Sequence, residues 1–240
     1  MTAPGKLSDV SVSGREGRRS PTRSAMPSRA AVVAVAPAVM AAAFVAHPFI
    51  GLGPPNDAAV AAAAASNTTL WGFSHLAVAV GSGLLAVAFL AIWSHLREAG
   101  EERWSSLGLP FVVMGSTLYA VLPGMEFAAL AAAETGADVR AAQSAVEPWF
   151  IPMILTSAVA FTIGAIAFAR GVGSIGLSSR ALTRVVVGGL VVLAVARLIP
   201  LTGVQFYVQS AALLVGLWPL AYEMWRRPKA AAHRVAVRAS

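Results

Sequence analysis

Six polar or ionisable side chains stand within otherwise apolar stretches of this 240-residue sequence: His47, His75, Glu126, Arg197, Gln205 and Gln209. An imidazole can bind a metal ion or haem iron, a carboxylate can carry a proton or a cation, and a guanidinium attracts anions. A charged side chain at the centre of a membrane helix costs about 2.5 to 3.5 kcal/mol, so such groups normally have partners or line a cavity. We therefore predict that these six residues meet in one polar cavity that binds a ligand.

The spacing of small residues favours an inward orientation for several of these side chains. His75 shares a helical face with small residues at offsets of four, seven and eleven, and Gln205 and Gln209 share another face with alanine and glycine. Because small residues mark places where membrane helices approach closely, we expect these polar groups to face protein rather than lipid. Pro123-Gly124 immediately precedes Glu126 and predicts a weakened helix with free backbone carbonyls beside the carboxylate.

Two of the chemistries open to these residues need a cofactor. His47 and His75 lie on consecutive apolar stretches at a similar depth, so they could bind one b-type haem, and together with Glu126 they could hold a divalent metal such as iron or zinc. The metal signal is weak, because the sequence has no closely spaced histidine pair of the H-x-x-x-H or H-E-x-x-H kind. The absence of cysteine excludes disulfides, iron–sulfur clusters and cysteine catalysis.

Binding or transport of a small solute or ion is the leading functional hypothesis. In this hypothesis Glu126 titrates, His75 tunes it and Arg197 attracts an anionic group. A non-catalytic membrane subunit or scaffold, whose polar residues only fix helix packing, is the alternative that needs no ligand. Retinal binding is excluded because the two lysines, Lys6 and Lys229, lie outside the apolar stretches, and no sequence motif identifies an enzyme.

Each candidate residue also has a purely structural explanation. Glu126 and Arg197 could neutralise each other as an ion pair, or Arg197 could extend alone to the lipid headgroups. His47, which precedes a proline, could be a solvated or capping histidine, and His75 could form a hydrogen bond to a neighbouring helix. Gln205 and Gln209 could hold neighbouring helices together by hydrogen bonds.

The composition of the chain is that of a membrane protein. Hydrophobic residues make up 57% of the chain and charged residues only 12%, whereas about a quarter of the residues in soluble domains are charged. Crossing a bilayer takes about 20 mostly apolar residues, and six stretches qualify, at about 30–50, 70–94, 107–133, 147–170, 182–201 and 204–225. We predict an all-α, polytopic integral membrane protein with a bundle of six transmembrane helices. Despite the formal net charge of +7, this composition excludes a nucleic-acid-binding domain.

The arginines and lysines predict the orientation of the bundle. Basic residues gather in the N-terminal segment, in the links after the second and fourth stretches and in the C-terminal tail, whereas the links on the other side hold only Arg140. Since cytoplasmic segments carry the excess of basic residues, we expect both the N and C termini to be cytoplasmic. The six candidate residues then all lie in the outer half of the bilayer.

The chain divides into three predicted parts: a disordered basic cytoplasmic tail over 1–28, a six-helix transmembrane domain over 29–226 and a basic cytoplasmic C-terminal tail over 227–240. Met26 is an alternative start of translation. The link 54–69 is expected to be an outer loop with a short interfacial helix. Trp71 and Trp93, 22 residues apart, are expected to mark the two membrane interfaces.

The chain is rich in alanine and valine, and its basic residues are almost all arginine rather than lysine, which is typical of a GC-rich bacterial gene. We therefore expect the protein in the bacterial inner (plasma) membrane. The lipid bilayer and further copies of this chain, as a homo-oligomer, are the expected partners.

Overall fold

The computed structural model describes residues 25–53 and 56–239, with side chains described from 28 to 53 and from 56 to 226. Within these residues the chain is all-helical, with no strand. The helices are α1 (Ala25–Ala46), α2 (Asp57–Ser66), α3 (Thr68–Glu98), α4 (Arg103–Thr135), α5 (Val139–Ile175), α6 (Arg180–Ala196) and α7 (Thr202–Ala239). The short helix predicted in the link 54–69 is confirmed as α2.

Local sequence signals explain where these helices begin and end. Asn67, Asp138 and Ser179 precede α3, α5 and α6, and each accepts a hydrogen bond from a backbone N–H of the first turn, which satisfies a donor that the helix leaves free. Gly136 ends α4 with a φ of 70°, a left-handed conformation that glycine adopts without steric cost. α1 ends at Ala46 because Pro48 disfavours the helical conformation at the residue before it.

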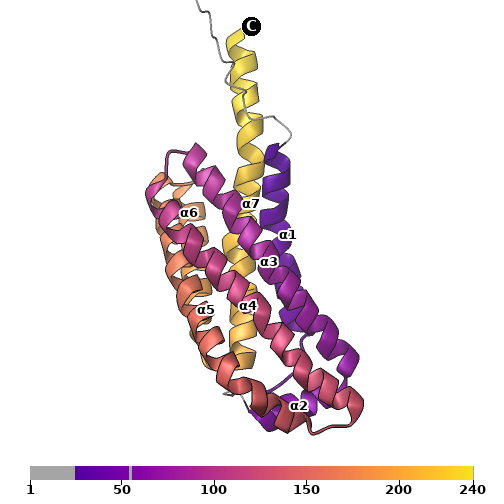
Figure 1. The fold of residues 1–240 in the computed structure, drawn as a ribbon. Coiled ribbons are helices and arrows are strands. Elements are labelled where there is room, and N and C mark those ends of the chain that lie inside the picture. Colours follow the sequence, from indigo (N-terminus) through magenta and orange to yellow (C-terminus); the bar gives the residue numbers. More distant parts are fainter. Residues whose placement is uncertain (1–24, 54–55, 240) are drawn as a thin grey trace, which may run out of the picture.

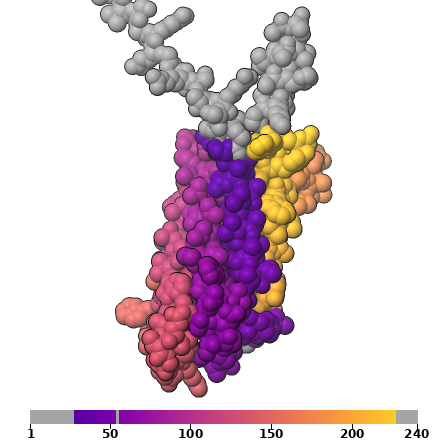
Figure 2. Space-filling model, turned by 90° about the vertical axis from the view of Figure 1, so that its right-hand side faces the viewer, coloured from indigo at the N-terminus to yellow at the C-terminus, as the bar shows by residue number. Residues whose placement is uncertain are grey.

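Six of the helices form a closed ring around the bundle axis. Each of α1, α3, α4, α5, α6 and α7 packs against the helix before it and the helix after it, and α7 packs back against α1. Figure 2 shows α1 (indigo) beside α7 (yellow) along the length of the bundle. Consecutive helices run in opposite directions, so the start of α1 and the end of α7 lie together at one end of the bundle and α2 lies at the other (Figure 1). We call these the terminal end and the α2 end.

Small residues allow the neighbouring helices of the ring to approach closely. A Cβ atom at Gly115 in α4 would lie 2.6 Å from the backbone nitrogen of Phe161 in α5. A Cβ at Gly189 in α6 would likewise lie 2.6 Å from the Cα of Gly216 in α7. The predicted small-residue face of the last helix therefore does meet a neighbouring helix, at Gly216.

Five of the described helices are long and apolar enough to cross a membrane, over Ser28–Ala46, Thr68–Glu98, Arg103–Thr135, Val139–Ile175 and Thr202–Arg226. The remaining predicted span, the fifth at about 182–201, corresponds to α6, which has 17 residues and ends before Arg197. Large apolar side chains such as Phe73, Leu155 and Val87 point outward from the ring. Long apolar helices with an apolar outer surface suggest an integral, multi-pass membrane protein.

Several expectations about particular segments need correction. The helix does not break at Pro123-Gly124, because α4 continues through both residues, although Pro123 has no N–H to donate to the carbonyl of Tyr119. Trp71 does not mark a lipid interface, since its side chain is only 1% exposed and faces the bundle interior. The predicted N-terminal tail lies outside the described residues up to residue 24, and the helix α7 continues through most of the predicted C-terminal tail.

Candidate ligand-binding cavity

A cavity of about 340 Å³ lies at the α2 end of the bundle. Its wall is built from residues of α1, α2, α3, α4, α5 and α7, together with the links that follow α1 and α6. Five of the six predicted site residues line it: His47, His75, Glu126, Arg197 and Gln205. The expected meeting of these residues therefore occurs, while their role in binding stays a prediction.

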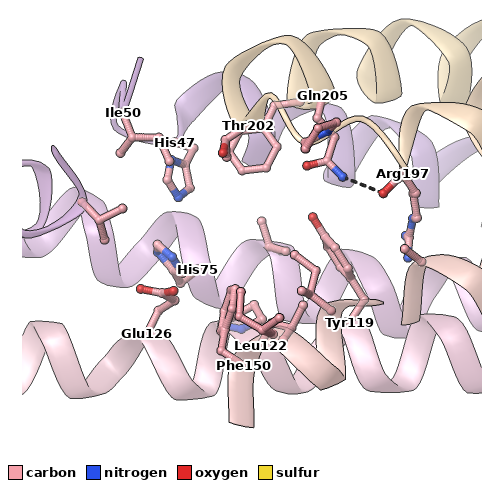
Figure 3. A pocket seen from close by; sticks show the side chains of 18 of the residues that line it. His47, Ile50, His75, Tyr119, Leu122, Glu126, Phe150, Arg197, Thr202 and Gln205 are labelled. Carbon is pink, nitrogen blue, oxygen red and sulfur yellow. Dashed lines mark hydrogen bonds between the residues drawn. The ribbon is translucent and has the colours of Figure 1, made fainter. Parts of the chain in front are cut away.

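The histidines form a pair at one end of the cavity. The ring centroids of His47 and His75 lie 4.8 Å apart with the ring planes tilted by 54°, and the two side chains point toward each other in Figure 3. The Nδ1 of His47 lies 2.8 Å from the carbonyl oxygen of Pro48, and the Nδ1 of His75 lies 2.7 Å from that of Trp71. Because a carbonyl can only accept, each Nδ1 carries the proton, which leaves each Nε2 as an acceptor in the neutral ring.

His47 lies beyond the last residue of α1, in the link that leads to α2. Burial lowers the pKa of His47 from its usual value, and the hydrogen bond to the carbonyl of Pro48 acts in the opposite direction. The ring is therefore neutral at pH 7. A neutral imidazole at this position can accept a hydrogen bond from a ligand.

Glu126 lies near the histidine pair and keeps one oxygen free. Gln143 in α5 donates from its Nε2 to the Oε1 of Glu126 at 3.1 Å, and the indole of Trp71 donates to the backbone carbonyl of Glu126 at 3.4 Å. The Oε2 of Glu126 and the Oε1 of Gln143 are buried without a hydrogen-bond partner. Two acceptor atoms at this end of the cavity wall are therefore without a partner in the described structure.

Arg197 occupies the other end of the cavity, directly after α6 (Figure 3). The side chain is only 4% exposed, and its guanidinium carbon lies 4.3 Å from the ring centroid of Tyr119 and 3.8 Å from that of Phe161. Gln205 donates from its Nε2 to the backbone carbonyl of Arg197 at 3.2 Å, which holds the start of α7 against this segment. The Nε and Nη1 of Arg197 are buried without a hydrogen-bond partner.

The wall between these two ends is mostly apolar. Leu122, Phe150 and Phe206 line it, and Figure 3 shows Leu122 and Tyr119 between the histidine end and Arg197. Gln209 is the one predicted residue outside the wall: it lies one turn beyond Gln205 in α7, is fully buried, and has no hydrogen-bond partner for either polar atom of its side chain. The proposed role of Gln209 as a fastener between helices therefore has no support in the described hydrogen bonds.

The structural explanations for Arg197 are wrong in this arrangement. Within the part of the chain that the structure describes, Glu126 and Arg197 form no ion pair, because the Oε2 of the first and the Nε and Nη1 of the second have no partner. Nor does Arg197 extend to the surface, since it is almost completely buried. The buried cation is stabilised by the faces of two aromatic rings rather than by a carboxylate.

The cofactor alternatives fit this geometry poorly. Among the described residues, no three His, Cys, Asp or Glu side chains come together as a metal ion would need, so His47, His75 and Glu126 do not form a metal centre. A haem iron would have to lie between the two imidazoles, with a metal–nitrogen bond of about 2 Å to each. Ring centroids only 4.8 Å apart leave no room for the iron and its porphyrin.

Sequence reasoning missed several residues of the wall, among them Gln143, Tyr119 and Trp71. Gln143 was missed because the fourth span was expected to start at Glu147, whereas α5 begins at Val139 and carries Gln143 into the bundle. An N-cap signal at Asp138 was available and places the start of the helix there.

Comparison with protein-family models, curated proteins and solved structures found no match. The chemistry of the cavity must then follow from its own geometry. Acceptor atoms gather at one end, an unpaired guanidinium lies at the other, and an apolar wall joins them. Such a cavity can hold a small molecule with polar groups at its ends, and 340 Å³ lies at the lower end of the usual range for small-molecule sites, about 300 to 1,000 Å³.

Proposed function

We propose that this chain is a six-span protein of the bacterial inner membrane, with both termini cytoplasmic, that binds a small solute in the cavity at its α2 end. The observation that carries the binding function is the set of buried, unpartnered polar atoms on Glu126, Gln143 and Arg197 around one cavity. Buried polar groups almost always have partners, and leaving one unsatisfied costs about 1 to 3 kcal/mol. A bound solute supplies the missing partners.

The place of α6 in the ring supports six spans. α6 packs between α5 and α7, and its 17 residues extend about 26 Å at the helical rise of 1.5 Å per residue. This length is a few ångströms short of an average hydrocarbon core of about 30 Å, a mismatch that a bilayer accommodates by local thinning at modest cost.

The basic residues support cytoplasmic termini. Arg29, Arg97, Arg170 and Arg180 belong to helix ends at the terminal end of the bundle, whereas Arg140 lies in the first turn of α5 at the α2 end. An excess of arginine on one side is the usual mark of the cytoplasmic face.

A pair of C-terminal fusions tests the topology. If the chain has six spans and cytoplasmic termini, green fluorescent protein fused to the C-terminus should fluoresce. Alkaline phosphatase fused at the same place should be inactive. An active phosphatase fusion would place the C-terminus outside the cytoplasm, and would overturn the proposal of six spans with cytoplasmic termini.

Thiol labelling tests the cavity, and the absence of native cysteine means that each introduced thiol is the only one. Val78 and Ala88 are both buried in α3, but only Val78 lines the cavity. We expect Val78→Cys to react with a small membrane-impermeant methanethiosulfonate added outside intact cells, and the matched control Ala88→Cys to stay unmodified. An unmodified Val78→Cys would show that solutes do not enter the cavity from outside, and would count against the proposal.

A further inference from the structure

Arg197 is the feature that specifies what the cavity can bind. It is a cation that is 4% exposed, and no carboxylate of the cavity wall (Asp57, Glu126 and Glu147) forms an ion pair with it in the described structure. A buried charge without a counter-ion carries a large desolvation cost. The faces of two aromatic rings offset part of this cost.

The aromatic contacts leave the hydrogen-bonding edges of the guanidinium unused. The rings of Tyr119 and Phe161 lie near its central carbon, whereas the N–H donors point outward in the guanidinium plane. Two of these nitrogens, Nε and Nη1, have no acceptor. A planar anion such as a carboxylate supplies acceptors to this edge geometry.

The rest of the wall limits the charge and shape of that anion. Arg197 is the one arginine or lysine of the cavity wall, so a single negative charge is neutralised there and a second is not. A second anionic group would also approach the carboxylates Asp57, Glu126 and Glu147, which line the cavity too. The apolar stretch at Leu122, Phe150 and Phe206 favours a hydrocarbon body next to the anionic group.

Resting on the binding function proposed above, we infer that the cavity binds a small monocarboxylic acid with an apolar body, its carboxylate paired with Arg197. The volume of about 340 Å³ favours a free acid with one short hydrocarbon chain over a lipid with two acyl chains. The polar groups of the histidine end lie at the far end of that body and accept hydrogen bonds from a polar substituent.

Equilibrium binding of radiolabelled octanoate to the full chain in lipid nanodiscs tests this inference, with empty nanodiscs subtracted. We expect saturable binding, and competition by unlabelled octanol, octylamine or acetate that is weaker than competition by octanoate by about tenfold or more. Octanol lacks the charge, octylamine reverses it, and acetate lacks the apolar body. Equal competition by octanol or octylamine would overturn the carboxylate assignment, and equal competition by acetate would overturn the apolar body.

A matched pair of arginine variants locates the charge. Arg197→Gln should weaken octanoate binding by about tenfold, whereas Arg170→Gln should leave it unchanged, because Arg170 also lies over an aromatic ring, that of Trp104, but outside the cavity. Unchanged binding in Arg197→Gln would overturn the inference. If that variant does not fold, the competition series on the unmodified chain decides the question alone.

Protection of the cavity thiol separates this inference from the proposed function. Octanoate should slow the modification of Val78→Cys, and octylamine should not. If Val78→Cys reacts but octanoate neither slows the reaction nor binds to the protein, the assignment of a monocarboxylic acid is wrong. The proposal of a solute-binding cavity would then remain. An unreactive Val78→Cys would remove both.

Discussion

At the terminal end of the bundle Arg29 and Glu98 lie 2.5 Å apart and join α1 to α3, whereas at the α2 end Glu126 and Arg197 line one cavity and do not pair. The carboxylate of Glu101 at the terminal end is also buried, and it accepts hydrogen bonds from the backbone nitrogens of Trp104 at 2.6 Å and Ser105 at 3.1 Å. Arg29, Glu98 and Glu101 thus each have a partner within the chain. At the cavity, by contrast, Glu126 and Arg197 are buried, and the Oε2 of Glu126 and the Nε and Nη1 of Arg197 have no hydrogen-bond partner in the described structure.

The largest effect is expected at Glu101. The residue at the N-cap of α4, Glu102, makes no capping hydrogen bond, so the neighbouring carboxylate of Glu101 satisfies the first turn. Glu101→Ala leaves two amides without their acceptor and should lower the free energy of unfolding by about 3 kcal/mol. Thermal unfolding of the detergent-purified protein measures this loss.

Glu102→Ala is the control for that prediction. Glu102 pairs with Arg97 at 2.6 Å, but its side chain is 66% exposed, and an exposed pair contributes less than about 1 kcal/mol. Equal losses in the two variants would show that the buried cap is no stronger than a surface ion pair.

The second prediction concerns Arg197 and has the opposite sign. Arg197→Met removes a buried charge without a counter-ion, and the desolvation cost of that charge exceeds the gain from its two aromatic contacts. In the absence of ligand the variant should be more stable than the parent chain by about 1 kcal/mol in the same unfolding assay. A large loss of stability would mean that Arg197 is a structural residue, like Glu101.

The third prediction separates two buried glutamines. Gln143→Leu breaks the hydrogen bond to Glu126 and should cost about 1 kcal/mol. Gln209→Leu removes an amide that has no partner, so it should leave stability unchanged or raise it slightly. Unfolding midpoints measured side by side check the difference, and a greater loss in Gln209→Leu would reveal a partner that Gln209 has in the membrane.

The smallest effect is a dependence on pH at His47. Because the pKa of His47 in the folded chain is lower than in the unfolded chain, its contribution to stability is complete above the unfolded value of about 6.5 and is lost as the pH falls. The neighbouring ring of His75, 4.8 Å away, adds a like charge when both rings are protonated, and the two charges repel each other. His47→Asn should therefore flatten the fall of the unfolding midpoint between pH 7 and pH 5, and an unchanged slope would contradict the prediction.

Much of the fold could be predicted from the sequence. The apolar stretches, their breaks and the N-cap residues predict helices, because burial in hydrocarbon requires every backbone group to be paired within its own helix. Each predicted stretch corresponds to a helix of the ring, and α2 was expected from the link that contains it. The helix ends were less predictable: α6 stops before Arg197, and α5 starts eight residues before Glu147.

The sequence by itself determined which polar residues lie at one end of the bundle. The depth of a residue along its helix follows directly from its number, at 1.5 Å per residue. Only the tertiary structure decided which of them meet. Contact between helices depends on their rotation and on close approaches such as Gly115 to Phe161, which depth does not specify. In that packing Gln143 donates a hydrogen bond to Glu126, and Arg197 lies against two aromatic rings. The guanidinium is left without a hydrogen-bond acceptor for its Nε and Nη1.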